Sequence, residues 1–328
     1  MIAGLGSIGR RHLRNLVALG QEDIILVRSH RSTLPEQELS GYPVETDLAM
    51  ALKQHRPDAV VIANPTAFHL QTALLAAESG CAMLLEKPIS HSLDGLDRLQ
   101  AAVHKTGARV LIGFQFRFHP SLVRAMHLLS AGELGRIMSA HVHYGEYLPA
   151  WHPWEDYRQA YAARADMGGG VLLTQCHSLD YLPWLVGEVE AAWGLLAKSS
   201  DLELDVDDTA EIGLRFTGGA LATLHLDYAQ QPPSHHFHVS GTRGFLQCDL
   251  LSGLVRVFRS ETNAWTDHPL PQNWERNMMF KDEMIHFLAV VRGEAQPACT
   301  LEDGLQVMRL IAAVEISQRT GQLVSLRP

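Results

Sequence analysis

The sequence predicts an α/β protein of two domains, a parallel sheet covered by helices on both faces followed by an α+β domain of mostly antiparallel strands. The chain has 328 residues, more than one ordinary hydrophobic core holds. Short apolar runs alternate with amphipathic segments as far as Pro120, and strand-like segments then follow one another. We therefore expect a first domain at 1–119 and a second at 120–328, with the C-terminal helix able to pack back on the first.

A glycine-rich turn opens the chain, with Gly4, Gly6 and Gly9 at the G-x-G-x-x-G spacing between a short apolar strand and a helical pattern. In dinucleotide-binding proteins the first glycine makes a tight turn, the second lets the backbone approach a pyrophosphate, and the third allows close helix–strand packing. The N–H groups of the first helical turn then face the phosphates. Glycine-rich turns without ligands also exist. The expected cofactor contacts of this turn are Gly4, Gly6, Ser7, Ile8 and Gly9.

The remaining elements of the first domain alternate between strand and helix. Apolar runs predict strands at 24–27, 58–63, 82–85 and 109–112, and amphipathic patterns predict helices at 48–54, 67–78 and 93–105. Continuous apolar strands between helices indicate a parallel sheet covered on both faces. Ligands of such sheets bind beyond the carboxyl ends of the strands. The cofactor candidates at or near these ends are Arg28, Ser29, Arg31, Asn64, Pro65, Thr66, His69, Glu86, Lys87 and Pro88.

Lys87 follows the buried strand 82–85 within the tripeptide Glu86-Lys87-Pro88. A lysine at this place points toward the expected position of a nicotinamide, and Pro88 fixes the local turn. Lys87 is therefore a catalytic candidate; a surface lysine at a strand end is the alternative.

The second domain begins with a helix expected at 121–130. The predicted strands that follow lie at 137–144, 190–197, 209–216, 220–228, 236–240, 245–249 and 254–258. Gly218-Gly219 between two of them is a hairpin signal. One helix is expected at 170–186, and two more at 279–292 and 301–320.

His177 and Asp180 lie three residues apart on the helix expected at 170–186, so they share a face. A carboxylate beside an imidazole holds its tautomer and raises its basicity, which suits a general acid/base. Both are catalytic candidates; a simple hydrogen bond on a helix face is the alternative. We interpret Cys176 beside them as small packing.

The segment 144–158 is rich in aromatic and polar side chains. Aromatic faces with interleaved polar groups suit sugar rings, whereas lid packing or an oligomer contact is the alternative. The full set of substrate candidates is Arg117, His119, Trp151, His152, Trp154, Tyr157, Arg158, Thr174 and His177.

Composition excludes several classes of protein. The net charge of −9 argues against nucleic-acid binding, and no apolar run approaches the length of a membrane span. The N-terminus leaves no room for a signal peptide, and the four separated cysteines indicate reduced thiols in a cytoplasm. The 18 histidines include two clusters, at 141–143 and 235–238, but neither has a carboxylate or cysteine at ligand spacing. We therefore expect strand-surface histidines and no metal site beyond adventitious binding.

The preferred cofactor depends on the end of the second strand. Sites for NAD usually have an acidic residue there, but this chain has Arg28-Ser29-His30-Arg31-Ser32. Arginines with a small hydroxyl suit a 2′-phosphate by charge and by bidentate geometry. The sequence therefore predicts NADP in preference to NAD; a solvated basic turn is the alternative.

Four motifs, in this order and spacing, resemble one family: GLGSIGRRH, ANPTAFH, EKPIS and GGGVLLTQCHSLDYLPWLVG. The chain is similar to the glucose-fructose oxidoreductase/inositol dehydrogenase (Gfo/Idh/MocA) family, and the resemblance continues to its end. It implies a Rossmann domain, then a domain with a large open sheet. It also implies hydride transfer with NAD or NADP at a carbinol of a sugar, polyol or nucleotide-sugar. The family's EKP lysine matches Lys87, and its catalytic histidine matches His177.

The resemblance has one departure. Many members have an aspartate four residues before the histidine, and some an acid three before it, where this chain has Leu173 and Thr174. Asp180 is then expected to orient His177. Two alternatives stay open: a glycosidase-type hydrolase of this fold that uses NAD transiently, and a non-catalytic nucleotide-binding regulator. The family's open sheet also implies a homodimer or homotetramer.

Overall fold

The chain divides into two units. The structure, a computed structural model, describes residues 1–28 and 37–326. Unit 1 contains residues 1–115, 166–168 and 276–308, and unit 2 contains 116–165, 169–275 and the residues from Arg309 onward. The first boundary lies close to the expected one after residue 119. Residues 276–308 return to unit 1 because α8 (Asn277–Arg292) packs against α1, β5 and β6.

Unit 1 is built on a six-stranded sheet in which every pairing is parallel. Its strands are β1 (Ile2–Ala3), β2 (Leu26–Val27), β3 (Val44–Glu45), β4 (Ala59–Ile62), β5 (Ala82–Glu86) and β6 (Val110–Gly113). Their order, β3-β2-β1-β4-β5-β6, is that of a doubly wound dinucleotide-binding sheet. The predicted parallel sheet is confirmed. The sequence does not predict β3, which is two residues long and not fully buried.

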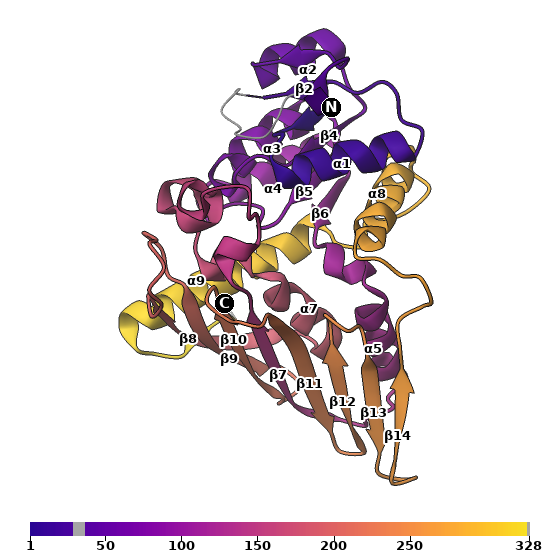
Figure 1. The fold of residues 1–328 in the computed structure, drawn as a ribbon, viewed down its shortest axis with the longest axis vertical. Helices are drawn as coiled ribbons and strands as arrows, with labels where there is room; N and C mark the ends of the chain where they lie inside the picture. Colours follow the sequence, from indigo (N-terminus) through magenta and orange to yellow (C-terminus); the bar gives the residue numbers. More distant parts are fainter. Residues whose placement is uncertain (29–36, 327–328) are drawn as a thin grey trace. The chain divides into compact units, whose positions relative to one another are not determined.

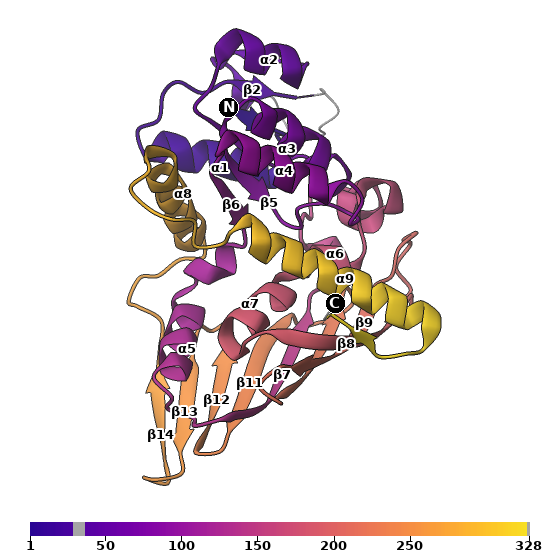
Figure 2. The same cartoon turned by 180° about the vertical axis from the view of Figure 1, so that it is seen from behind.

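Helices cover both faces of this sheet, as its continuously apolar strands require. They are α1 (Ser7–Ala18), α2 (Leu48–His55), α3 (His69–Glu78), α4 (Leu96–Thr106) and α8. Figures 1 and 2 show α1 and α8 on one face and α3 and α4 on the other. Ile62, Met83 and Leu84 are fully buried between these layers. The carboxyl ends of β1, β4 and β5 consequently lie at one edge of the sheet.

Unit 2 is built on a nine-stranded sheet of order β14-β13-β12-β11-β7-β10-β9-β8-β15. The strands are β7 (Ile137–Gly145), β8 (Val189–Ala197), β9 (Thr209–Phe216), β10 (Leu221–Asp227), β11 (Ser234–Gly241), β12 (Gly244–Asp249), β13 (Val255–Arg259), β14 (Ala264–His268) and β15 (Val324–Ser325). All pairings are antiparallel except that of β7 with β10, so the mostly antiparallel prediction is confirmed. The sequence does not predict β14 or β15.

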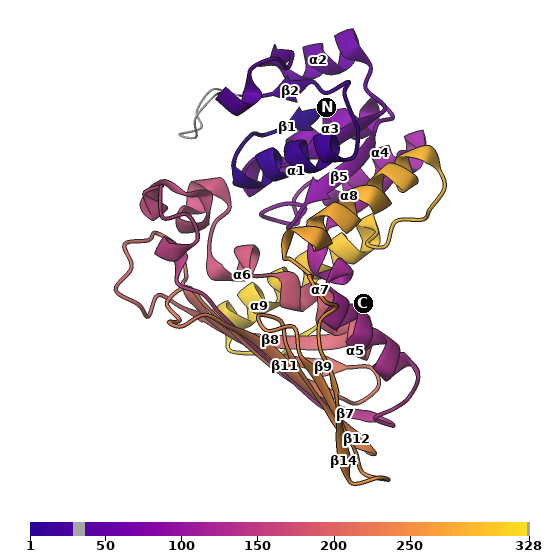
Figure 3. The same cartoon turned by 45° about the vertical axis from the view of Figure 1, so that its right-hand side comes forward.

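Only one face of the unit 2 sheet is covered by helices in the described part of the chain. Figure 3 views the sheet close to edge-on and shows α5 (Pro120–Ser130), α6 (Val171–Thr174) and α7 (His177–Val186) on the same side. Burial alternates along the strands accordingly: Val142, Leu224 and Phe237 are buried beneath the helices. The opposite face, here called the open face, carries the intervening side chains.

The single helix expected at 170–186 is wrong, because the chain forms α6 and α7 with a break between them. Gln175 and Cys176 have ψ angles of 24° and 0°, far from the value of about −42° in an α-helix. The Gln175 side chain also donates to the Asp227 carbonyl at 3.0 Å, which anchors the break to β10. The break makes His177 the first residue of α7. No helix among the described residues is both long and apolar enough to span a membrane.

Candidate active site

The glycine turn after β1 leaves open space where a cofactor phosphate would lie. Gly4 has φ +97°, and a Cβ on it would lie 2.4 Å from the Asn64 nitrogen. A Cβ on Gly9 would lie 2.0 Å from the Gly4 carbonyl oxygen, whereas a Cβ on Gly6 would meet nothing within 4 Å. Packing within unit 1 therefore explains the first and third glycines. It does not explain Gly6, where the missing side chain leaves the backbone open to a ligand.

The first turn of α1 has the character of an anion site. Gly6 is the N-cap residue, so no side-chain cap hydrogen bond forms, and no acidic side chain lies in the first turn. The backbone N–H groups of Ser7 and Ile8 begin the helix, where the helix dipole is positive. Together with the space at Gly6, this turn fits a pyrophosphate.

His69 connects two of the segments predicted to bind the cofactor. Its Nδ1 lies 2.7 Å from the Pro88 carbonyl oxygen, and its Nε2 lies 2.8 Å from the Asn64 carbonyl oxygen. The ring is buried, and this burial lowers the pKa of His69. The Asn64 amide donates to the Thr72 hydroxyl at 2.8 Å. The His69 ring is thus used within unit 1 to hold the loops after β4 and β5 together.

Two further candidates stand beside Asn64. Pro65 precedes the short 3-10 helix Thr66–Phe68, and Thr66 is buried. These residues continue the edge of the sheet that carries the glycine turn, because β4 is the neighbour of β1.

Glu86, which precedes Lys87, forms a buried group of titratable side chains with His12 and Glu283, and the sequence does not predict this group. Lys87 is half-buried at the end of β5, and its peptide bond to Pro88 is cis. Glu86 is buried and lies 2.7 Å from His12 Nε2 on α1. Glu283 on α8 is fully buried beside them, and neither of its carboxylate oxygens has a hydrogen-bond partner among the described residues. Burial, and then the charge of Glu86, raise the pKa of Glu283 well above its ordinary value.

The residues expected to select the cofactor are only partly described. Arg28 is buried at the end of β2, where its backbone N–H donates to the Glu45 carbonyl at 3.0 Å. Ser29 and Arg31 lie outside the described residues.

In unit 2, His177 begins α7 and is only 3% exposed. The Phe116 ring lies edge-on to its imidazole, with ring centroids 4.8 Å apart. Asp180, one turn later, is also buried, and Arg117 donates to both of its carboxylate oxygens at 2.7–3.1 Å. Asp180 was expected to orient His177; the structure adds Arg117 as its ion-pair partner.

Three of the predicted substrate residues make internal contacts in unit 2. The guanidinium of Arg117 is engaged by Asp180, as described above. His119 Nδ1 accepts from the Ser121 N–H at 3.2 Å and so caps α5. The Thr174 hydroxyl donates to the Gly170 carbonyl at 2.8 Å and contacts the Tyr228 hydroxyl. The sequence does not predict the contacts of Arg117 with Asp180 and of Thr174 with Tyr228, because these partners are 63 and 54 residues apart.

The aromatic segment contains both packed and exposed side chains. Trp151 is half-buried with its ring edge-on to Tyr228 at 5.5 Å. His152 packs 5.4 Å from Trp154, which is 67% exposed. The remaining two candidates, Tyr157 and Arg158, contact the loop that contains Glu203.

Those contacts converge on Glu203. Arg158 donates to Glu203 at 2.9 Å and to Asp156 at 2.8 Å, and the Tyr157 hydroxyl accepts from the Glu203 N–H at 3.1 Å. Trp154 is therefore the exposed aromatic ring of the segment.

Two family models match the chain, one in each half. Residues 1–114 match a model described as oxidoreductase family, NAD-binding Rossmann fold. Residues 122–247 match the GFO/IDH/MocA C-terminal domain.

Similar proteins include two curated relatives that span nearly the whole chain. An uncharacterized oxidoreductase of Bacillus subtilis, YrbE, is 27% identical, with 99% of this chain and 95% of the relative covered. A D-xylose 1-dehydrogenase (NADP(+)) of Haloferax volcanii is 25% identical over 99% and 98% of the two chains. A solved levoglucosan dehydrogenase in complex with NADH has a TM-score of 0.88 at 19% identity, covering 99% and 98%, which shows a shared fold.

Proposed function

Because this chain belongs to the Gfo/Idh/MocA family of oxidoreductases, we propose that it transfers a hydride between a nicotinamide cofactor and a carbinol or carbonyl carbon of a sugar, polyol or nucleotide-sugar. The observation that carries the proposal is the turn at Gly6, with open space above an uncapped helix start. The sugar class is supported by the names of the relatives, which include a D-xylose dehydrogenase.

In the proposed reaction the chain moves a proton while the bound nicotinamide exchanges the hydride. His177 accepts the hydroxyl proton during oxidation and returns it during reduction. Lys87 polarises the same oxygen by its charge or relays the proton. Asp180, held by Arg117 through both oxygens, is a positioning residue on the helix that begins at His177.

Substitution of Lys87 tests this assignment. Lys87→Met is expected to lower turnover at least about 100-fold, since loss of a positioned acid/base group costs 10²–10⁴. The dissociation constant of the cofactor should change little. Lys105→Met, an exposed lysine on α4, is the matched control. Full turnover by the Lys87 variant would remove this residue from the reaction.

We further propose NADP as the preferred cofactor. The support is the basic run that starts at Arg28 and the lack of an acidic residue between positions 28 and 32. Fluorescence titration of both cofactors should give the lower dissociation constant for NADP, and Arg28→Gln should weaken NADP more than NAD. Tighter binding of NAD by the wild type would refute the preference.

A substrate screen with both cofactors would identify the substrate. It would also distinguish the proposed oxidoreductase from the alternative, a hydrolase that uses the cofactor transiently. Sugars, polyols and nucleotide-sugars should change the nicotinamide absorbance in proportion to product. Product formation without net cofactor turnover would instead establish a hydrolase.

Association through the open face is the proposed quaternary arrangement. Trp193, Leu195 and Leu221 are 36%, 51% and 57% exposed on strands of this face, and these apolar side chains support pairing with a second copy. Light scattering should give a dimer or tetramer, and Leu195→Glu should reduce its mass. A monomeric wild type would exclude the arrangement.

A further inference from the structure

The open face carries a row of imidazoles at the centre of the unit 2 sheet. The register places His225 of β10 beside His143 of β7, and His143 beside His236 of β11. The rings stack in the same order, with centroids 4.8 Å apart for His225 and His143 and 5.4 Å apart for His143 and His236. β7, which lies far from β10 and β11 in the sequence, thus brings its imidazole between theirs.

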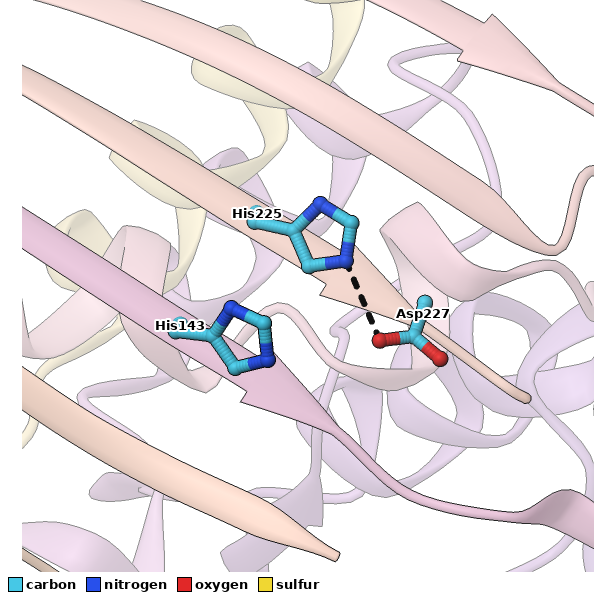
Figure 4. A group of neighbouring side chains, drawn as sticks. All are labelled: His143, His225 and Asp227. Atoms are coloured by element: carbon cyan, nitrogen blue, oxygen red, sulfur yellow. Dashed lines mark hydrogen bonds and ion pairs between the residues drawn. The ribbon is translucent and has the colours of Figure 1, made fainter. Parts of the chain in front are cut away.

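A carboxylate closes one end of this row. Asp227 ends β10, and its Oδ2 lies 3.1 Å from His225 Nε2. Figure 4 shows both the His143 and the His225 ring with one nitrogen on the side of this carboxylate. One ligand atom from each of the three residues lies within 4.8 Å of the others.

We propose that His143, His225 and Asp227 bind one divalent transition-metal ion, of the class of Zn²⁺ or Co²⁺. Two imidazoles and one carboxylate are a ligand set that such ions accept. Tetrahedral bonds of about 2.1 Å require ligand atoms roughly 3.4 Å apart. His225 Nε2 and Asp227 Oδ2 already lie 3.1 Å apart, and since all the ligand atoms lie within 4.8 Å of one another, side-chain rotation has to close the other separations by at most about 1.4 Å. The three residues occupy three of the four tetrahedral positions, which leaves the fourth for water.

Further side chains contact the two histidine ligands and orient their rings. Glu211 Oε1 lies 2.6 Å from His225 Nδ1. Without a metal, His225 Nε2 lies at the Asp227 carboxylate and donates its proton there, so the ion has to displace this proton. With the Nδ1–H still donated to Glu211, the Nε2 lone pair then binds the ion, which is the carboxylate–histidine–metal arrangement of known zinc sites. His143 Nε2 lies 3.3 Å from Gln230 Oε1, which adds an amide oxygen beside the site.

The Asp227 carboxylate is fixed as firmly. Its Oδ1 accepts from the N–H groups of Ala229 and Gln230 at 2.7 and 2.6 Å, which leaves Oδ2 for the site. A Cβ on Gly145 would lie 2.2 Å from Oδ2, so the glycine on the neighbouring strand provides the space that this oxygen occupies. The carboxylate is therefore positioned before any ion binds.

Metal titration of the chelator-treated protein tests the proposal. Calorimetry with Zn²⁺ and absorbance of added Co²⁺ should each give one saturable equivalent. His143→Gln and His225→Gln should each weaken binding at least tenfold, because each removes an imidazole ligand. Glu211→Gln should weaken it about 10- to 100-fold through the His225 tautomer.

His141→Gln is the matched control, since His141 lies two residues along β7 on the same face and bonds Thr223 instead. It should bind like the wild type. With 18 histidines in the chain, weak additional binding is expected and is separated by stoichiometry. The proposal fails if no one-equivalent site exists, or if both ligand variants, verified as folded by circular dichroism, bind as tightly as the His141 variant. These measurements do not use turnover, so their outcome is independent of the proposed oxidoreductase activity.

Discussion

Glu283→Gln is expected to stabilise the protein at neutral pH. Glu283 is fully buried, its carboxylate oxygens have no hydrogen-bond partner in the described chain, and Glu86 lies beside it. Burial first, and the charge of Glu86 second, raise the pKa of Glu283 well above the ordinary 4.5. Above pH 4.5 the unfolded chain releases this proton while the folded chain keeps it, so the free energy of unfolding falls as the pH rises.

The size of the effect follows from proton linkage. One additional proton bound by the folded state lowers the free energy of unfolding by about 1.4 kcal/mol per pH unit. For a unit of roughly 150 residues this corresponds to about 3–6 °C in Tm for each pH unit. Near pH 4.5 and below, the variant and the wild type should differ little, because a protonated carboxyl and an amide are similarly unsatisfied at this position. The advantage of the variant then grows with pH until the folded protein itself releases the proton.

Calorimetric Tm values between pH 5 and 8 measure this difference, and infrared spectra test the protonation directly. Asp282→Asn is the matched control, because Asp282 is the preceding residue of α8 and is exposed. The carbonyl band of a protonated carboxylic acid at neutral pH should be lost in Glu283→Gln and kept in the control. Parallel pH profiles of wild type and Glu283→Gln would show that Glu283 is ionised in the fold and would refute the reasoning.

Two further predictions concern the glycine turn and the buried ion pair. Gly6→Ala should leave the unfolding midpoint of the ligand-free protein almost unchanged yet weaken cofactor binding at least tenfold, whereas Gly9→Ala should destabilise the ligand-free protein, since its Cβ would meet a carbonyl oxygen at 2.0 Å. Equal effects of the two on unfolding would contradict the assignment of the space at Gly6. Asp180→Asn should cost about 3–5 kcal/mol in denaturant unfolding because it leaves Arg117 buried without its counter-charge. Asp156→Asn, at an exposed ion pair, should cause no measurable change, and similar losses from both would refute the argument.

The sequence predicts the sheets well because their signals are local. The apolar run of β4 predicts a strand buried on both faces, and the alternation along β9 predicts a strand with one buried face, so both strands lie where expected. β3, β14 and β15 leave no such signal: β14 is mostly exposed along its length, and the other two are two residues long. These strands form because neighbouring strands offer hydrogen bonds, and a one-dimensional pattern does not contain that information.

Candidate sites are predicted unevenly for the same reason. The turn at Gly6 is contiguous, so spacing alone identifies it. Arg117 and Asp180 are 63 residues apart, and each looks like a ligand-binding side chain until the fold pairs them. Likewise, the histidines form groups along single strands in the sequence. The sheet register instead places His143 of β7 beside His225 of β10, about 80 residues away in the sequence.

The Arg117–Asp180 pair changes what Asp180 can contribute to the proposed chemistry. A carboxylate that accepts two strong hydrogen bonds from a guanidinium has little tendency to take a proton. Asp180 therefore does not replace, as a proton acceptor, the acid that is missing at Leu173 and Thr174. Its charge lies in the first turn of α7, at the positive end of the helix dipole and one turn after His177. In the reaction we propose, Asp180 is therefore a positioning residue.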